Sequence, residues 1–96
     1  VLLVAPDRLG VLHDVTASLG LARARGFAPD ALVLSTPGEP DASTGSNAAE
    51  LQRLRIAEPL AIFPHTSPLD ATSLQAASTL VDRFLSQAPR QLRACR

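Results

Sequence analysis

The 96-residue sequence contains no lysine, tryptophan, tyrosine or methionine, and only three phenylalanines. Without lysine the chain cannot complete a phosphate-binding loop, in which a lysine contacts the β- and γ-phosphates, or a Schiff-base mechanism. Because aromatic residues are scarce, the core must consist mainly of Leu, Val, Ile and Ala. The single cysteine, Cys95, cannot form an internal disulfide, and we therefore expect a protein of the reducing cytoplasm.

Charge and hydropathy exclude further classes of protein. Nine acidic residues balance nine basic residues, all of them arginine, so the formal net charge is zero. This balance argues against binding to nucleic acid or to a membrane surface through bulk electrostatics. No segment approaches the roughly 18 apolar residues of a membrane span. The hydrophobic content of 46% is that of a globular chain, and the length fits one domain or part of one.

Two short apolar runs flank an amphipathic segment in the first third of the chain. Val1–Ala5 and Ala31–Ser35 do not alternate with polar residues, which predicts strands buried on both faces. Between them, four apolar residues recur at helical spacing: Leu12, Val15, Leu19 and Ala22. A strand, a helix and a strand at this spacing form a βαβ unit, so the two strands should be parallel with a right-handed crossover.

Turn residues set the limits of this first helix. It should begin at Asp7 or Gly10 and run to about Arg25, and Gly26 should end it in a left-handed conformation. Gly20 lies in its middle at a cost of about 1 kcal/mol relative to alanine. We interpret Gly20 as a point of close packing on the sheet.

The rest of the chain predicts one more strand and two helices. After a loop over residues 36–46, Asn47 and Glu50 form a capping-box pattern for a helix to about Leu54. Pro59–Phe63 predicts a third strand. A last helix should be capped by Asp70, Thr72 or Ser73 and end at about Gln87, before Pro89. Its predicted apolar stripe is Leu74, Ala77, Leu80, Val81, Phe84 and Leu85.

These elements predict an α/β fold, a partial Rossmann-like parallel sheet of about three strands with three helices, over residues 1–88. Residues 89–96 should form a flexible tail. Because no cap, turn or polar segment precedes Val1, we interpret the chain as the carboxyl-terminal piece of a longer domain. A sheet without its neighbouring strands has a bare apolar edge, so the isolated chain should aggregate or swap.

Ligands of open α/β sheets bind beyond the carboxyl ends of the strands. This places the expected site at Pro6–Gly10, where an inner strand should give way to a helix. Free N–H groups and the positive end of the helix dipole favour an anion there, and Gly10 allows its close approach. The interpretation requires Val1–Ala5 to be an inner strand, parallel to Ala31–Ser35.

Three segments carry a resemblance to a known family: VLLVA followed by DRLG and LHD, a helix that ends in LARARG, and a later PLAIFP. Together they resemble the carboxyl-terminal half of dethiobiotin synthetase, an ATP-dependent ligase with a P-loop NTPase fold. The resemblance spans about residues 1–85. It implies biotin biosynthesis, in which diaminopelargonic acid and CO2 form a cyclic urea with ATP and Mg²⁺, and a homodimer in the full-length protein.

The resemblance also implies site residues. The substrate carboxylate would be bound by the turn and the start of the first helix, at Arg8, Leu9, Gly10, Val11, Leu12 and His13. The nucleotide would lie against Ser35, Thr36, Pro64, His65 and Thr66. The P-loop and most ligands of ATP and Mg²⁺ would lie upstream of Val1. The chain would therefore supply no catalytic residue and be inactive alone.

Other functions remain open at this point. His13 and His65 are too far apart in sequence to indicate a metal site, and no G-x-S-x-G motif indicates a hydrolase. The chain could be a non-catalytic binding or regulatory module with a nucleotide-binding fold. It could also be a fragment of a ParA-like, MinD-like or cobyrinic acid amide synthetase-like ATPase, families in which the same strand–turn–helix unit recurs.

Overall fold

The computed structural model describes residues 1–91, which form three strands and three helices. The strands are β1 (Leu2–Pro6), β2 (Ala31–Ser35) and β3 (Ala61–Phe63). The helices are α1 (Val11–Ala24), α2 (Asn47–Arg53) and α3 (Ala71–Gln91). The predicted α/β fold with a three-stranded parallel sheet is confirmed.

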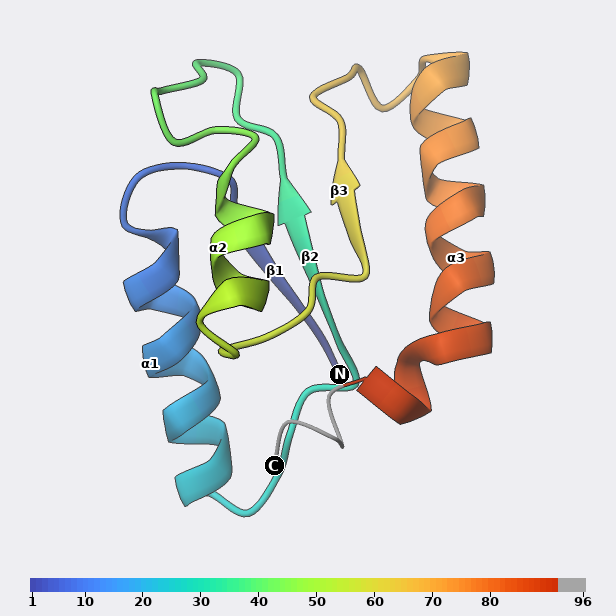
Figure 1. Ribbon diagram of the computed structural model, residues 1–96. Helices are drawn as coiled ribbons and strands as arrows, with labels where there is room; N and C mark the ends of the chain where they lie inside the picture. Colours follow the sequence, from blue (N-terminus) through green and yellow to red (C-terminus); the bar gives the residue numbers. More distant parts are fainter. Residues whose placement is uncertain (92–96) are drawn as a thin grey trace.

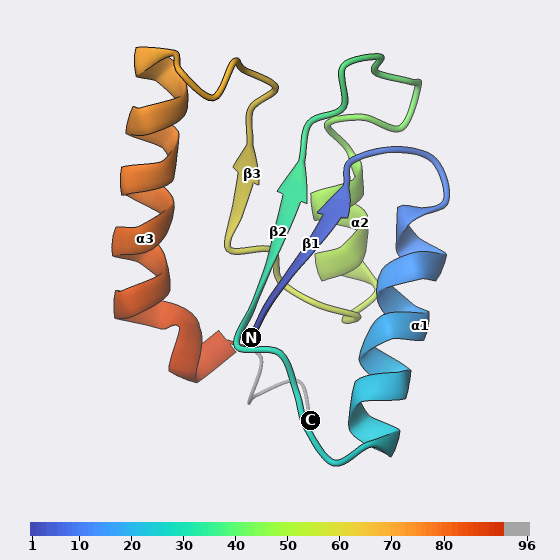
Figure 2. The same ribbon diagram turned by 180° about the vertical axis from the view of Figure 1, so that it is seen from behind.

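The sheet has the order β1-β2-β3, and both pairs of neighbouring strands are parallel. In β1 and β2, Leu2 pairs with Ala31 and Pro6 with Ser35, and in β2 and β3, Ser35 pairs with Phe63. Helices α1 and α2 lie on one face of the sheet and α3 lies on the other (Figures 1 and 2). All three strands therefore end at the same edge, where the chain turns into the loops that hold the predicted site.

The main core lies between the sheet and the helices α1 and α2. Leu32 and Leu34 of β2 point into it with no exposed surface, and Leu51 of α2 is equally buried. The predicted inner face of α1 is confirmed, because Val15, Leu19 and Ala22 are buried and Leu12 is half-buried against the core. On the other face, a smaller cluster joins Ala31 and Leu60 to Leu80 and Phe84 of α3.

Strand β1 does not have the predicted position. It lies at the edge of the sheet, and Leu2 and Val4 are 41% and 56% exposed. Only β2 is buried along both faces, at residues 31–34. An apolar run of this length fits an inner strand or an edge strand of the sheet. The sequence pattern indicates which residues favour burial, but it does not indicate which element covers them. Of the two conditions set for the expected site at Pro6–Gly10, an inner β1 is therefore not met, whereas the parallel pairing of β1 with β2 is.

Helix α1 begins and ends at glycines with positive φ. Gly10 precedes the helix at φ 95° and Gly26 follows it at φ 84°, so the predicted stop at Gly26 is confirmed. The interpretation of Gly20 is wrong. It is exposed, and a Cβ added to it would meet no atom within 4 Å, so no close packing on the sheet explains it.

Alanine substitutions at Gly10 and Gly20 should have opposite effects on stability. Both positions have open space for a Cβ, so the backbone conformation determines the sign of the change in stability. Gly10→Ala places an L-residue at φ 95° and should destabilise the protein by about 1–2 kcal/mol. Gly20→Ala should stabilise it by about 0.5–1 kcal/mol because the glycine is inside a helix. Urea denaturation measures both changes, and equal signs would contradict the prediction.

The last third of the chain differs from prediction in three details. Strand β3 begins at Ala61 rather than at Pro59, although Leu60 already donates to Leu32 O of β2 at 2.8 Å. Helix α3 continues to Gln91 past Pro89, because a proline removes a backbone hydrogen bond without always ending a helix. The predicted tail therefore begins inside α3, and residues 92–96 lie outside the described part.

The apolar stripe predicted for α3 is only partly correct. Leu80 and Phe84 contact the sheet, whereas Leu74, Val81 and Leu85 are 66%, 55% and 73% exposed. The half-buried face of α3 is instead Ser73, Ala76, Leu80 and Phe84. The helix packs mainly over β2 and β3, so a narrow stripe is enough to make the contact.

Within residues 1–91, no helix is long and apolar enough to cross a membrane.

Candidate functional site

The predicted site residues gather at the carboxyl edge of the sheet. Backbone hydrogen bonds continue the sheet beyond the strands there: Asp7 donates to Ser35 O at 2.8 Å, and Thr36 donates to Phe63 O at 2.8 Å. These two bonds bring together the turn after β1, the start of the loop after β2 and the loop after β3. The structure therefore places both predicted groups, one for the substrate and one for the nucleotide, along the same edge.

The turn between β1 and α1 retains unpaired amide groups. Some are bonded within the turn, since Arg8 donates to Pro6 O and Val11 donates to Arg8 O. Within residues 1–91, the backbone N–H groups of Gly10, Leu12 and His13 have no acceptor. Free amides at the first turn of a helix attract anions, because the helix dipole places partial positive charge there.

Three amides of this turn are not free, contrary to prediction: those of Arg8 and Val11 are bonded within the turn, and that of Leu9 donates to a side chain. The carboxylate of Asp41, in the loop between β2 and α2, accepts a hydrogen bond from Leu9 N at 2.8 Å. The other carboxylate oxygen accepts from Ser43 N and Ser43 Oγ at 2.9 and 2.6 Å. These donors, Leu9 N first, lower the pKa of Asp41 to about 2. An anion of the protein itself thus occupies the Leu9 amide.

The hydrogen bonds of Asp41 predict a pH dependence of stability. Because its pKa is lowered to about 2 by folding, its contribution is complete above the ordinary value near 3.8 and is lost as the pH falls towards 2. The melting temperature of Asp41→Asn should therefore fall less steeply between pH 4 and pH 2 than that of the wild type. Calorimetry measures this, with Glu39→Gln in the same loop as the control. Identical slopes for wild type and Asp41→Asn would contradict the prediction.

A buried carboxylate joins the turn to the beginning of α2. Asp7, directly after β1, is 1% exposed. Its oxygens accept hydrogen bonds from Asn47 Nδ2 at 2.8 Å and from Gly45 N at 3.0 Å. Its backbone oxygen accepts from Thr44 Oγ1 at 2.8 Å. Residues about 40 positions apart are thereby held together, which fixes the loop over the turn.

Asn47 does not have the role predicted for it. The structure places the cap of α2 at Ser46, without a side-chain capping bond, and Asn47 is the first helical residue. Its amide points into the interior, 5% exposed, because the buried Asp7 carboxylate needs a donor. The capping-box interpretation is wrong, since a local pattern does not show that a distant charge competes for the same side chain.

The predicted nucleotide residues form the other part of this edge. Ser35, Thr36, Pro64 and Thr66 are half-buried and His65 is exposed. The imidazole of His65 lies against Gly38, where an added Cβ would be 3.2 Å from its Cε1 atom. Thr66 Oγ1 is buried and has no hydrogen-bond partner within residues 1–91. A buried hydroxyl of this kind is available to a ligand that supplies a donor or an acceptor.

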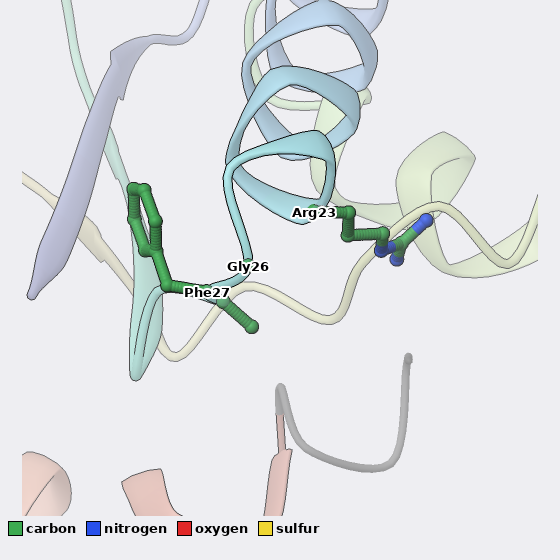
Figure 3. Close-up of a pocket in the computed structure, with 4 residues that line it drawn as sticks. Arg23, Gly26 and Phe27 are labelled. Carbon is green, nitrogen blue, oxygen red and sulfur yellow. The ribbon is translucent and has the colours of Figure 1, made fainter.

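Another cavity lies elsewhere. It has a volume of about 230 Å³ and is lined by Arg23, Gly26, Phe27 and Ala28, after the carboxyl end of α1. Figure 3 shows that the Phe27 ring turns towards the strands, while the Arg23 side chain extends in the opposite direction. The cavity is at the amino-terminal edge of the sheet, so it takes no part in the predicted site.

Metal ligands do not converge at the predicted site. Residues 1–91 contain no group of three or more His, Cys, Asp or Glu side chains arranged to hold a metal ion. His13 and His65 belong to different segments, the first on α1 and the second after β3, and both are exposed.

The sequence prediction gave no contacts for three residues of this edge: Asp7, which lies inside the expected site at Pro6–Gly10, Asp41 and Gly38. The run from Asp41 to Ser43 carries a local signal, because Asp side chains bond backbone amides two residues ahead. Asp7 and Gly38 carry none, since their partners lie about 40 and 27 positions away in the sequence. No family model, curated protein or solved structure matches this chain.

Proposed function

We propose that the chain is the carboxyl-terminal portion of a cytoplasmic ATP-dependent ligase resembling dethiobiotin synthetase. The observation that carries the proposal is the group of free amides of Gly10, Leu12 and His13 at the carboxyl edge of a parallel sheet. In the resembled family this turn binds the carboxylate of diaminopelargonic acid. The arrangement of donors and the flexibility of Gly10 fit a carboxylate.

The adenine end of ATP would contact the neighbouring loops. Thr66 Oγ1, buried without a partner among the described residues, fits a hydrogen bond to a base, and Thr36 and His65 lie on the same edge. ATP supplies the phosphoryl group that activates the substrate carbamate before ring closure. The chain has no lysine for a P-loop and its described residues hold no metal cluster. Its own residues would therefore orient the substrate and the base and leave Mg²⁺ to other residues.

Nuclear magnetic resonance titrations test the two binding steps separately. Diaminopelargonic acid with bicarbonate should shift the amide signals of Gly10, Leu12 and His13, and ATP should shift those of Thr36 and Thr66. Gly10→Val should abolish the first response, because it fills the approach to the amides, and leave the second unchanged. Gly20→Ala is the matched control, since it changes a glycine of the same helix away from the site.

Product formation tests the reaction itself. The chain is mixed with a separately produced P-loop portion of a dethiobiotin synthetase, ATP, Mg²⁺, bicarbonate and diaminopelargonic acid. Mass spectrometry should then detect dethiobiotin, and the chain alone should give none. Binding at the amides without any product in the mixture would favour a non-catalytic binding module. The Asp41 carboxylate, which already occupies the Leu9 amide, is the observation that supports this second function.

A further inference from the structure

Helix α3 has two apolar stripes, and only one of them contacts the sheet. The half-buried stripe consists of residues 73, 76, 80 and 84. The second stripe follows it by one position at each point and consists of Leu74, Ala77, Val81 and Leu85, all of them exposed. One residue turns an α-helix by about 100°, so the two stripes are neighbours along the helix. The second stripe therefore borders the contact with the sheet without belonging to it.

The exposed stripe of α3 faces the side of β1. Arg83 Nη1 donates to Leu60 O at 3.3 Å, directly before β3, so the residue that precedes Phe84 lies on the side of β3. Leu85 follows Phe84 and therefore lies on the opposite side of the half-buried stripe, towards β1. Figure 2 shows the same arrangement: α3 lies beside β3, and among residues 1–91 no helix lies over β1 on this face.

Strand β1 has an apolar surface next to this stripe. Leu2 pairs with Ala31 and Val4 pairs with Val33, and Ala31 belongs to the cluster under α3. Leu2 and Val4 therefore point to the face that carries α3, where they are 41% and 56% exposed. The four residues of the exposed stripe stand above these two strand residues, and we name the six together the apolar step.

The apolar step lies in an uncharged part of the surface. Residues 1–6 and 71–81 contain no charged side chain. Monomeric proteins seldom leave a continuous apolar surface of several hundred Å² uncovered, and such surfaces commonly mark sites of protein association. The absence of charge leaves no electrostatic repulsion between two such surfaces and selects a partner that is itself apolar and uncharged.

We propose that the apolar step is the interface of a symmetric dimer of this chain. A step is complementary to itself, because a rotation of 180° about an axis parallel to the strands places α3 of each copy over β1 of the other. The two α3 helices then lie parallel and side by side in one layer between the two sheets. One contact thus covers both the exposed stripe and the surface of β1.

The area of the apolar step fits a weak dimer. At 25 cal/mol per Å², burying a leucine or valine removes roughly 60–120 Å² of apolar surface from water. The five leucines and valines of the step are 41% to 73% exposed, which corresponds to roughly 300 Å² per copy. Interfaces are slightly more than half apolar, so two copies would bury on the order of 1,000 Å² in total, and we expect a dissociation constant on the order of 100 µM.

Sedimentation equilibrium of the full 96-residue chain tests the proposal. Between about 10 µM and 2 mM, the weight-average mass should rise from that of a monomer towards that of a dimer and no further. Val81→Lys should raise the dissociation constant at least about tenfold, because symmetry brings two lysines into the interface. Val4→Lys should do the same from the strand. Leu21→Lys is the matched control, since Leu21 is 58% exposed against 55% for Val81 but lies on α1, on the other face.

A disulfide across the axis tests the arrangement of the two copies. In parallel helices related by a two-fold axis, Ala77 lies opposite its counterpart. Ala77→Cys, in a chain that also carries Cys95→Ser, should therefore form a cross-linked dimer under mild oxidation. Ala17→Cys in the same background is the control, because Ala17 is exposed on α1 and away from the step. It should remain reduced or cross-link much more slowly.

Four results would overturn the proposal: a monomer over the whole concentration range, association beyond a dimer, equal dissociation constants for Val81→Lys and Leu21→Lys, and cross-linking of Ala17→Cys as fast as that of Ala77→Cys. Circular dichroism of each variant should match the wild type, which separates loss of the interface from loss of the fold. The inference does not rest on the proposed ligase function, since no residue of the step belongs to the carboxyl edge of the sheet.

Discussion

Asn47→Ala is expected to lower the free energy of unfolding by about 2–3 kcal/mol, since hydrogen bonds to buried charged groups contribute about this amount. The Asn47 amide donates to the buried Asp7 carboxylate and to Ser43 Oγ, and its removal leaves Asp7 with Gly45 N as the donor to its carboxylate. An alanine offers no replacement, and at 1% exposure water does not reach Asp7 readily. Urea denaturation followed by circular dichroism measures the change.

A double-mutant cycle tests whether Asp7 and Asn47 act as a pair. Asp7→Ala and Asn47→Ala should each be costly, and the double variant should lose clearly less than the sum, because removing both partners leaves no unpaired charge. Gln52→Ala is the control, since Gln52 is exposed on the same helix. Strict additivity of the two substitutions would show that the bond at 2.8 Å contributes nothing.

Leu34→Ala is expected to destabilise the protein by about 2–5 kcal/mol, the range for removing a fully buried leucine. Leu34 has no exposed surface and belongs to the cluster formed by β2, α1 and α2. A domain of this size has a total stability on the order of 5–15 kcal/mol, so the variant would lose a large fraction of it. The same denaturation experiment measures the loss.

The control for Leu34→Ala is a leucine outside the core. Leu74→Ala truncates a side chain that is 66% exposed on α3 and should change stability by less than about 0.5 kcal/mol. Similar losses for both variants would show that burial in the main core does not determine the effect.

Local patterns in the sequence were enough to predict most of the fold. The apolar run Ala31–Ser35 predicts a buried strand, and the helical spacing that ends at Ala22 predicts the buried face of a helix. The structure confirms both predictions. The edge position of β1 was not predictable in this way. Leu2 and Val4 are apolar residues of the kind usually buried, but no described element covers them. Whether such a residue is buried depends on which elements pack beside its strand.

The candidate site was predictable in position and not in detail. The turn with Gly10 follows β1 at the expected edge because parallel strands all end there. The contact of Asp41 with Leu9 and that of Asn47 with Asp7 join residues 32 and 40 positions apart. Such contacts depend on how the loop between β2 and α2 folds back, and the residue types alone do not determine that path.

The helices on the two faces of the sheet are packed against it with unequal burial of side chains. Helix α3 rests on β2 and β3 through half-buried side chains and one bond from Arg83 Nη1 to Leu60 O at 3.3 Å, whereas α1 and α2 enclose fully buried leucines and valines. Because fewer buried side chains hold α3, we expect it to detach before the layer of α1 and α2, and its detachment would uncover Ala31 and Leu60. The turn, the loop and the polar pair that hold the carboxyl edge together have their contacts in that other layer, so local opening of α3 would leave them in place.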